Sequence, residues 1–282
     1  MIDLIEKFIT DDDRVLISDI TNNDFELLIK SVDDWSIFNN NSKHIATDYD
    51  ILGMHLLRCV LSERILEYKR NMMGSLNYPE YEEFIENGVV AISDFNHRYN
   101  YDKFDKLMKH ITAINRHYSL VGWAVRNDEK VEYDLQYTMH VDTFHPAFKS
   151  FGYVNDVMVE TGPFSYVKGS HRNTKSKLNL LYKLSVKRSN AILYEGLTRD
   201  KNIERWNDSF RLDTKEDYCI DSVEINKYLQ RYGLPNESLV EGKSNTYIIT
   251  DTSGFHRKYP AEVGNVRISS RLVLDRPNPF LI

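Results

Sequence analysis

The chain has 282 residues, of which 41% are hydrophobic, and a formal net charge of −6. A chain of this length can bury a full hydrophobic core, and barrel folds of this size often form one domain. The acidic balance argues against general nucleic-acid binding, which requires a basic surface.

The two cysteines, Cys59 and Cys219, lie far apart in the sequence. Without a Cys-x-x-Cys arrangement they favour free thiols in a reducing compartment. The N-terminus lacks a basic start followed by an apolar segment, and no window of the sequence approaches the length of a membrane span. We therefore expect a cytoplasmic protein that makes no contact with the membrane.

No Pro/Gly/Ser-rich linker or internal repeat interrupts the sequence, which predicts a single domain over residues 1–282. Ile51 to Lys69 carries aliphatic residues at three-and-four spacing, the pattern of an amphipathic helix, and Phe104 to Ile114 repeats this pattern. Helices of this kind usually cover a sheet. We predict a helical N-terminal extension over residues 1–80 and a core over residues 82–282.

Strand-like segments dominate the second half of the chain. The predicted strands are Leu120 to Val125, Val131 to Asp142, Phe151 to Val159, Phe164 to Val167, and further strands from Thr246 to the C-terminus. Residues from about 172 to 243 form a predicted insert, in which Ser222 to Tyr232 reads as a helix. This order predicts a mainly β fold with flanking helices, a double-stranded β-helix of the jelly-roll or cupin-like type.

The segment Val131 to Asp142 alternates strictly between apolar and polar residues, which predicts a strand with one polar face. Gln136, Thr138, His140 and Asp142 share that face. Residues two apart in a strand point to the same side, so His140 and Asp142 deliver a nitrogen and an oxygen into one site. Two imidazoles and one carboxylate hold non-haem Fe(II) on one face of an octahedron. The third ligand can come from a neighbouring strand.

Candidates for the rest of such a site lie downstream. His256 follows a turn-like stretch after the apolar strand candidate Tyr247 to Thr250. Arg267 and Ser269 share one face of a later alternating strand. A guanidinium and a hydroxyl placed in this way form a good receptor for a terminal carboxylate.

In this order of motifs the chain resembles the phytanoyl-CoA dioxygenase-like family of Fe(II)/2-oxoglutarate-dependent oxygenases. The resemblance depends on His140-Val-Asp142, on the Gly-Pro-Phe-Ser-Tyr-Val-Lys-Gly-Ser-His-Arg motif ending at Arg172, and on Phe255-His256 followed by Arg267. The segment Phe84 to Phe95 is similar to the opening of the family's domain. Lys168 stands where the family commonly has a proline. The resemblance covers residues 82 to 282.

The resemblance implies that His140, Asp142 and His256 bind Fe(II) and that Arg267 holds the C5 carboxylate of 2-oxoglutarate. Ser269 is expected to assist Arg267, and Gln136 and Thr138 are further expected cofactor contacts. The implied reaction uses O2, releases succinate and CO2, and hydroxylates a small-molecule metabolite. Related halogenases replace the carboxylate ligand by a small residue, so Asp142 favours hydroxylation, while desaturation or ring closure stays open.

Five residues have competing interpretations. His140 and Asp142 could be an ordinary surface pair on a half-buried strand. His171 is the rival for the third ligand, but it follows a glycine turn and is interpreted as ordering that turn. His145 could contact substrate or be an ordinary loop histidine. Arg271 shares the face of Arg267, where it competes for the dicarboxylate or contacts substrate.

Other functions and the substrate also stay open. A metal-binding relative without oxygenase activity and a cupin-type enzyme that uses its metal as a Lewis acid are the alternatives. Six basic residues lie near the motifs in the sequence, either as a solvated rim or as a receptor for an anionic small molecule: Lys149, Lys168, Arg172, Arg257, Lys258 and Arg271.

Overall fold

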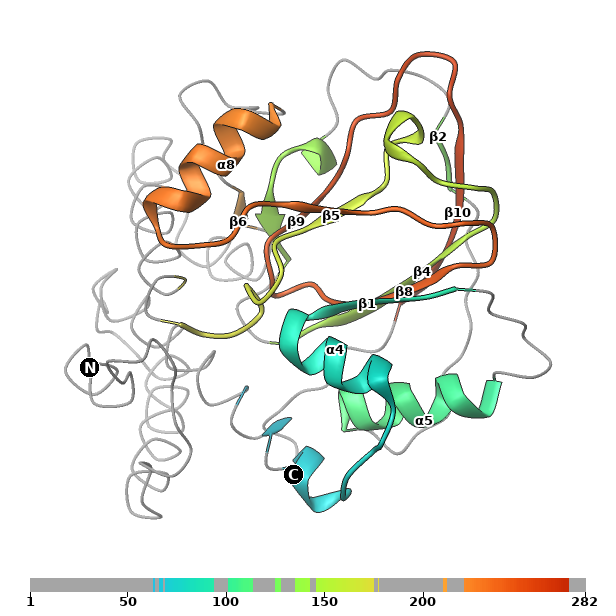
Figure 1. The fold of residues 1–282 in the computed structure, drawn as a ribbon, viewed down its shortest axis with the longest axis vertical. Helices are drawn as coiled ribbons and strands as arrows, with labels where there is room; N and C mark the ends of the chain where they lie inside the picture. The colour runs from blue at the N-terminus through green and yellow to red at the C-terminus, as the bar shows by residue number, and fades with distance from the viewer. Residues whose placement is uncertain are drawn as a thin grey trace, which may run out of the picture.

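A computed structural model of the chain describes residues 63, 66–67, 69–93, 101–113, 125–127, 135–142, 146–174, 177, 210–211 and 221–273. The two-sheet core is drawn in Figure 1. The strands are β1 Val89–Ile92, β2 Val125–Asn127, β3 His140–Val141, β4 Phe148–Tyr153, β5 Phe164–Tyr166, β6 Phe210–Arg211, β7 Ser238–Val240, β8 Tyr247–Asp251, β9 His256–Lys258 and β10 Arg267–Val273. The helices are α4 Pro79–Asn87, α5 Tyr101–Thr112, the 3-10 turns η2 Leu135–Tyr137 and η3 Val159–Thr161, and α8 Ser222–Arg231.

Within the described residues, the strands form two five-stranded sheets, in the orders β1-β8-β4-β10-β2 and β6-β3-β9-β5-β7. Every strand pairing is antiparallel. From β2 to β5 each strand crosses to the other sheet, and from β7 to β10 the chain does so again. This alternation is the connectivity of a double-stranded β-helix, so the predicted fold class is confirmed.

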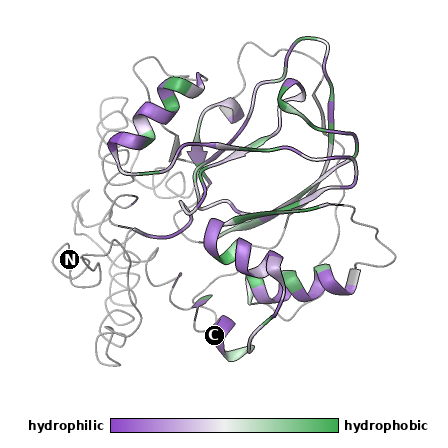
Figure 2. Ribbon diagram, in the orientation of Figure 1, coloured by the Kyte–Doolittle hydropathy of each residue, from purple (hydrophilic) through white to green (hydrophobic). Residues whose placement is uncertain are grey.

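Helices α4 and α5 lie beside the β1-β8-β4 side of the first sheet (Figure 1). Phe84, Leu107 and Ile111 on these helices are fully buried in one cluster with Val90 and Ile249 of the sheet. Figure 2 shows hydrophobic and hydrophilic positions on both helices, as their amphipathic sequences require. The predicted helix Phe104 to Ile114 is therefore confirmed with a start three residues earlier.

Helix α4 has a proline at its first position and ends at Gly88, which adopts the left-handed conformation with φ 74°. The chain can then reverse at once into β1, which pairs with β8. Of the predicted helix Ile51 to Lys69, residues 63, 66–67 and 69 are described and are helical, while the rest of it and most of the predicted extension over residues 1–80 lie outside the described residues. No described helix has the length and apolar composition needed to cross a membrane.

The prediction of a single strand from Val131 to Asp142 is wrong over residues 135–139. Residues 135–137 form η2, a bend follows at Thr138, and only His140 and Val141 are in a strand. Tyr137, Met139 and Val141 are buried, and so are Thr138 and His140. Thr138 and His140 therefore line the protein interior, whereas Gln136 is exposed.

Other predicted strands differ at their ends. The strand predicted over Phe151 to Val159 is β4, which begins at Phe148 and ends at Tyr153, because the chain then turns into η3. The strands predicted at residues 164–167 and 247–250 are confirmed as β5 and β8, and β10 and α8 also lie where expected. β7 lies in the segment predicted as an insert, yet it pairs with β5 in the core.

Candidate metal centre

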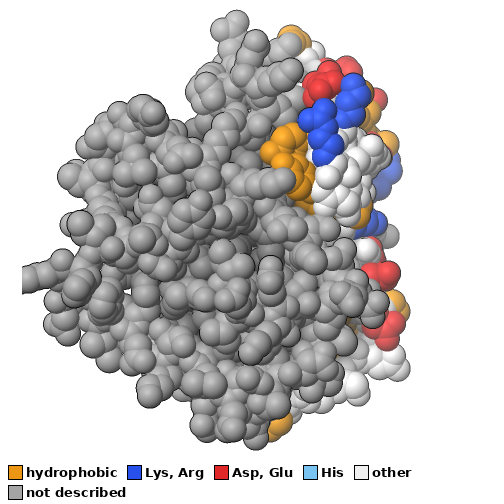
Figure 3. Space-filling model, turned by 90° about the vertical axis from the view of Figure 1, so that its left-hand side faces the viewer, with side chains coloured by type: hydrophobic (Ala, Val, Ile, Leu, Met, Phe, Trp, Pro, Cys, Tyr) orange, Lys and Arg blue, Asp and Glu red, His pale blue; other side chains and the backbone are white. Residues whose placement is uncertain are grey.

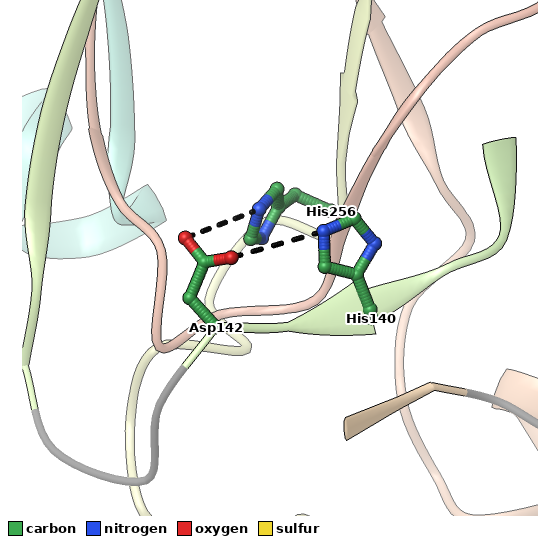
Figure 4. Close-up of side chains that lie close together, drawn as sticks. All are labelled: His140, Asp142 and His256. Atoms are coloured by element: carbon green, nitrogen blue, oxygen red, sulfur yellow. Dashed lines mark ion pairs between the residues drawn. The ribbon is translucent and has the colours of Figure 1, made fainter. Parts of the chain in front are cut away.

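Three predicted ligands converge between the sheets (Figure 4). His140 is in β3, Asp142 follows that strand, and His256 begins β9. His140 and His256 are direct partners across the antiparallel β3–β9 pair. One ligand atom from each of the three residues lies within 4.8 Å of the others. The prediction that these residues meet is therefore confirmed, and the interpretation of His140 and Asp142 as a surface pair is wrong.

The two histidines are oriented in the same way. His140 Nδ1 lies 2.7 Å from the carbonyl oxygen of Thr138, and His256 Nδ1 lies 2.9 Å from that of Gly254. A carbonyl can only accept a hydrogen bond, so each Nδ1 carries the proton and each Nε2 of the neutral ring carries a lone pair. In known metal sites, a hydrogen bond at the ring nitrogen that does not bind the metal orients the imidazole.

Both lone pairs face Asp142. His140 Nε2 lies 3.8 Å from Asp142 Oδ1, and His256 Nε2 lies 3.8 Å from Asp142 Oδ2. Two ligands of one metal ion can be at most about 4.2 Å apart when each bond is about 2.1 Å. Both separations are shorter than this limit. The donor types suit one transition-metal ion, and the three side chains would draw closer on binding, because adjacent ligands with bonds of about 2.1 Å lie about 3.0 Å apart.

The charges around Asp142 keep it ionised. Burial alone would raise its pKa, but His256 when protonated, together with the charge and hydrogen bond of Lys149, outweighs burial and holds the pKa of Asp142 well below its usual value. Lys149 of β4 forms an ion pair with Asp142 Oδ2. The ligand carboxylate is thus anionic at neutral pH, as metal binding requires.

The turn before His256 is fixed by hydrogen bonds. Asp251 Oδ1 accepts the main-chain N–H groups of Ser253, at 2.9 Å, and Ala147, at 3.1 Å. The Asp142 N–H donates to the carbonyl oxygen of Thr252 at 2.9 Å. The turn that leads into His256 therefore also holds the main chain at Asp142.

Gly254 packs against a buried tyrosine. A Cβ atom at this position would overlap Tyr166 Oη and would lie 2.6 Å from Tyr166 Cζ and 3.0 Å from Ser170 Oγ. Tyr166 Oη itself donates to the Asp251 carbonyl at 2.8 Å. A glycine is required here because the turn lies directly on the tyrosine ring.

Arg267 and Ser269 lie in β10, in the sheet opposite the histidines, and both are buried. Their neighbours Ile268 and Ser270 are only partly buried, so the predicted shared inward face is confirmed. Arg267 Nη1 donates to the carbonyl oxygen of Gly162. The charge of Arg267 also acts on Tyr153, whose pKa burial raises to about 12.

The other predicted contacts are placed less favourably. Gln136 is exposed on η2, while Thr138 is buried and supplies its carbonyl to His140. Their role as cofactor contacts stays a prediction. His145 and the side chain of Arg271 lie outside the described part of the chain.

His171 lies away from the three ligands. Its ring packs on Phe84 with centroids 6.4 Å apart, and Nε2 lies 3.2 Å from the carbonyl oxygen of Ile85 in α4. Burial and the charges of Lys177 and Arg172 lower its pKa well below the usual value. The interpretation that His171 orders its turn agrees with these contacts.

The basic residues near the motifs do not form one solvated rim. Arg257 is fully buried and pairs with Glu237, and Lys149 pairs with Asp142. On the coloured part of the surface in Figure 3, basic and acidic side chains lie next to each other. The sequence does not predict a role for Glu237, because nothing in its local sequence marks it as the partner of Arg257 in another strand.

None of the known family profiles matches the chain, and no curated protein matches it. Among solved structures, it is similar to HygX from Streptomyces hygroscopicus with iron bound, at 14% identity over 70% of this chain and 85% of that chain, with a TM-score of 0.36. It is also similar to the α-ketoglutarate-dependent epimerase SnoN from nogalamycin biosynthesis, at 11% identity over 69% and 80% of the two chains and a TM-score of 0.35. Scores of this size do not establish a shared activity.

Proposed function

We propose that this protein is an Fe(II)/2-oxoglutarate-dependent oxygenase of the phytanoyl-CoA dioxygenase-like type that hydroxylates a small molecule. The observation that carries the proposal is the pair of histidines whose Nε2 atoms each lie 3.8 Å from a different oxygen of Asp142. Two histidines and one carboxylate with open positions beside them are typical of non-haem Fe(II) oxygenases.

In this proposal His140, Asp142 and His256 hold Fe(II), and Arg267 with Ser269 holds the distal carboxylate of 2-oxoglutarate. An Fe(II) ion bound there would supply O2 activation and the oxidative decarboxylation of 2-oxoglutarate to succinate and CO2, coupled to oxidation of the substrate. Burial of Arg267 favours its proposed role, because a charge-assisted bidentate contact to a carboxylate is stronger where water is excluded.

The protein's own contribution is orientation and exclusion of water. The Thr138 and Gly254 carbonyls set the tautomer of the two rings, so both Nε2 lone pairs would be available to a bound metal. His140 is 1% exposed and His256 is 5% exposed, which supports a small-molecule substrate because a bulky partner could not reach the ligands. Asp142 supplies a carboxylate ligand, and this supports hydroxylation over halogenation.

Succinate formation tests the proposal. The purified protein with Fe(II), 2-oxoglutarate and O2 should release succinate, and Asp142→Ala should abolish this release. The same assay with Zn(II) should give no succinate. Turnover that continues with Zn(II) and is indifferent to 2-oxoglutarate would instead identify a Lewis-acid enzyme, and metal binding without any succinate would identify an inactive relative.

A further inference from the structure

Arg257 directly follows His256 in β9, and its side chain is fully buried. Its guanidinium makes a two-pronged contact with Glu237, from Nε to Oε2 at 2.8 Å and from Nη2 to Oε1 at 2.7 Å. The Glu237 side chain is 4% exposed. An ion pair this deeply buried must be matched by further hydrogen bonds, because both charges have lost their water.

The remaining contacts of the guanidinium reach two other segments. Nη1 donates to the carbonyl oxygen of Tyr137, in η2, at 3.2 Å. Nη2 donates to Ser222 Oγ at the start of α8 at 2.9 Å. Glu237 in turn accepts from Ser165 Oγ of β5 at 2.6 Å. One guanidinium therefore joins β9, η2, α8 and the residue before β7.

One of these segments, β9, carries His256, and another, η2, leads into the strand of His140. Tyr137 directly precedes Thr138, whose carbonyl orients His140, and Arg257 directly follows His256. Lys258, the next residue of β9, also places its Nζ 4.9 Å from the centre of the Tyr137 ring. The spacing between the two imidazoles is therefore fixed by the β3–β9 register and, independently, by this contact between β9 and η2.

We infer that Arg257 is a positioning residue for the metal site, which fixes the segment before His140 against the strand of His256 and couples α8 to both. This inference rests on the proposed metal-binding function. It assigns no contact between Arg257 and metal or substrate. Glu237 serves by holding the guanidinium in the orientation from which Nη1 reaches the Tyr137 carbonyl.

The test measures Co(II) binding by the full chain. The visible absorption spectrum reports the coordination of the ion, and competition with a chelator gives the dissociation constant. Arg257→Met combined with Glu237→Gln removes both buried charges, so neither is left unpaired. We expect Co(II) binding to weaken by about 10–100-fold, the range found when partners of metal ligands are replaced. The spectrum at saturation should also change. Arg257→Lys keeps the charge but not the fork and should fall between the double variant and the wild type.

Two controls separate positioning from general damage. Leu107→Ala opens a cavity in the α5 core and should lower stability without changing Co(II) affinity. Glu224→Gln with Lys227→Met removes an exposed ion pair of α8 and should change neither property. If the double variant does not fold, the Co(II) affinity and spectrum of Arg257→Lys alone test the positioning role.

The outcomes distinguish this inference from the function on which it rests. A wild-type protein that binds no Co(II) would overturn the proposed function. A wild-type protein that binds Co(II), together with Arg257 variants of unchanged affinity and spectrum, would overturn the positioning role and leave the metal site intact. An equal loss of Co(II) affinity in Leu107→Ala would show that the Arg257 variants act only through lowered stability, and would also overturn the positioning role.

Discussion

His140 and His256 present their Nε2 lone pairs because main-chain carbonyls hold both Nδ1 protons. Replacing either histidine, or Asp142, by Ala removes one of three ligands. We expect Co(II) affinity to fall by more than about 100-fold in each variant, since even partners of ligands are worth 10–100-fold. Equilibrium dialysis against Co(II) measures this loss. Wild-type affinity in all three variants would be incompatible with the site.

His171→Ala is the matched control for these variants. His171 contacts Ile85 and Phe84 near α4 and is not among the converging side chains. Its replacement should leave the Co(II) dissociation constant unchanged, although stability can fall. Loss of the metal from this variant would mean that the third ligand is assigned to the wrong histidine.

We expect replacement of Arg267 and replacement of Arg271 to affect the affinity for 2-oxoglutarate differently. Arg267→Ala should cost about 2–5 kcal/mol, a factor of roughly 30 to several thousand in 2-oxoglutarate affinity, because a charge-assisted pair is lost from a buried site. Arg267→Lys should restore part of it, since the charge returns without the fork. Arg271→Ala should leave this affinity nearly unchanged. Anaerobic titration of 2-oxoglutarate measures the constants, and a loss confined to Arg271→Ala would reverse the assignment.

At the level of elements, the turn between β8 and β9 sets the position of His256. Gly254→Ala should destabilise the fold by about 1–3 kcal/mol, the range for overpacking, because its Cβ atom would overlap Tyr166. It should also weaken Co(II) binding, since the Gly254 carbonyl would shift away from His256. Urea unfolding and Co(II) titration measure the two effects. Tyr166→Phe in the same chain should recover part of the stability by removing the overlapping hydroxyl.

The buried ion pair between Arg257 of β9 and Glu237 predicts that the stability of the fold depends on pH. Burial raises the pKa of Glu237, but hydrogen bonds and the charge of Arg257 outweigh burial and hold it below the usual value of 4.5. A lowered pKa means that the stabilisation is present above about pH 4.5 and is lost as the pH falls through the folded-state pKa.

Glu237→Gln should therefore lower the free energy of unfolding by about 3 kcal/mol at pH 7, because Arg257 is left buried without its counter-charge. The difference from wild type should shrink below about pH 4.5. Urea unfolding across this pH range measures it. A difference that is constant with pH would show that Glu237 carries no charge in the folded protein.

The sequence predicts elements well where local periodicity and burial agree. Helices α5 and α8 and strands β5, β8 and β10 have such patterns. The strand predicted from Val131 fails over residues 135–139 because the chain forms η2 and then bends at Thr138, which brings a carbonyl to His140. The contact of Arg257 with Glu237 depends on sheet register between β9, β5 and β7, which no local pattern encodes.

At the scale of the whole molecule, the order of strands is what brings distant motifs together. Alternation between two sheets sets β3 beside β9, so His140 and His256 become neighbours although they lie 116 positions apart in the sequence. The same alternation places β10, with Arg267, in the facing sheet. The ordered motifs could thus predict both the fold and the convergence of His140, Asp142 and His256, while the supporting contacts of Lys149 and Arg257 became visible only in three dimensions.

Anaerobic titration of the wild-type protein with Fe(II) and then 2-oxoglutarate tests the central claim most directly. If His140, Asp142 and His256 hold Fe(II) with open positions beside them, one equivalent of each should produce a metal-to-ligand absorption band. The band should be absent in Asp142→Ala and should require much more 2-oxoglutarate in Arg267→Ala. A wild-type protein that gives no such band, or an Asp142→Ala variant that gives the wild-type band, would contradict the account.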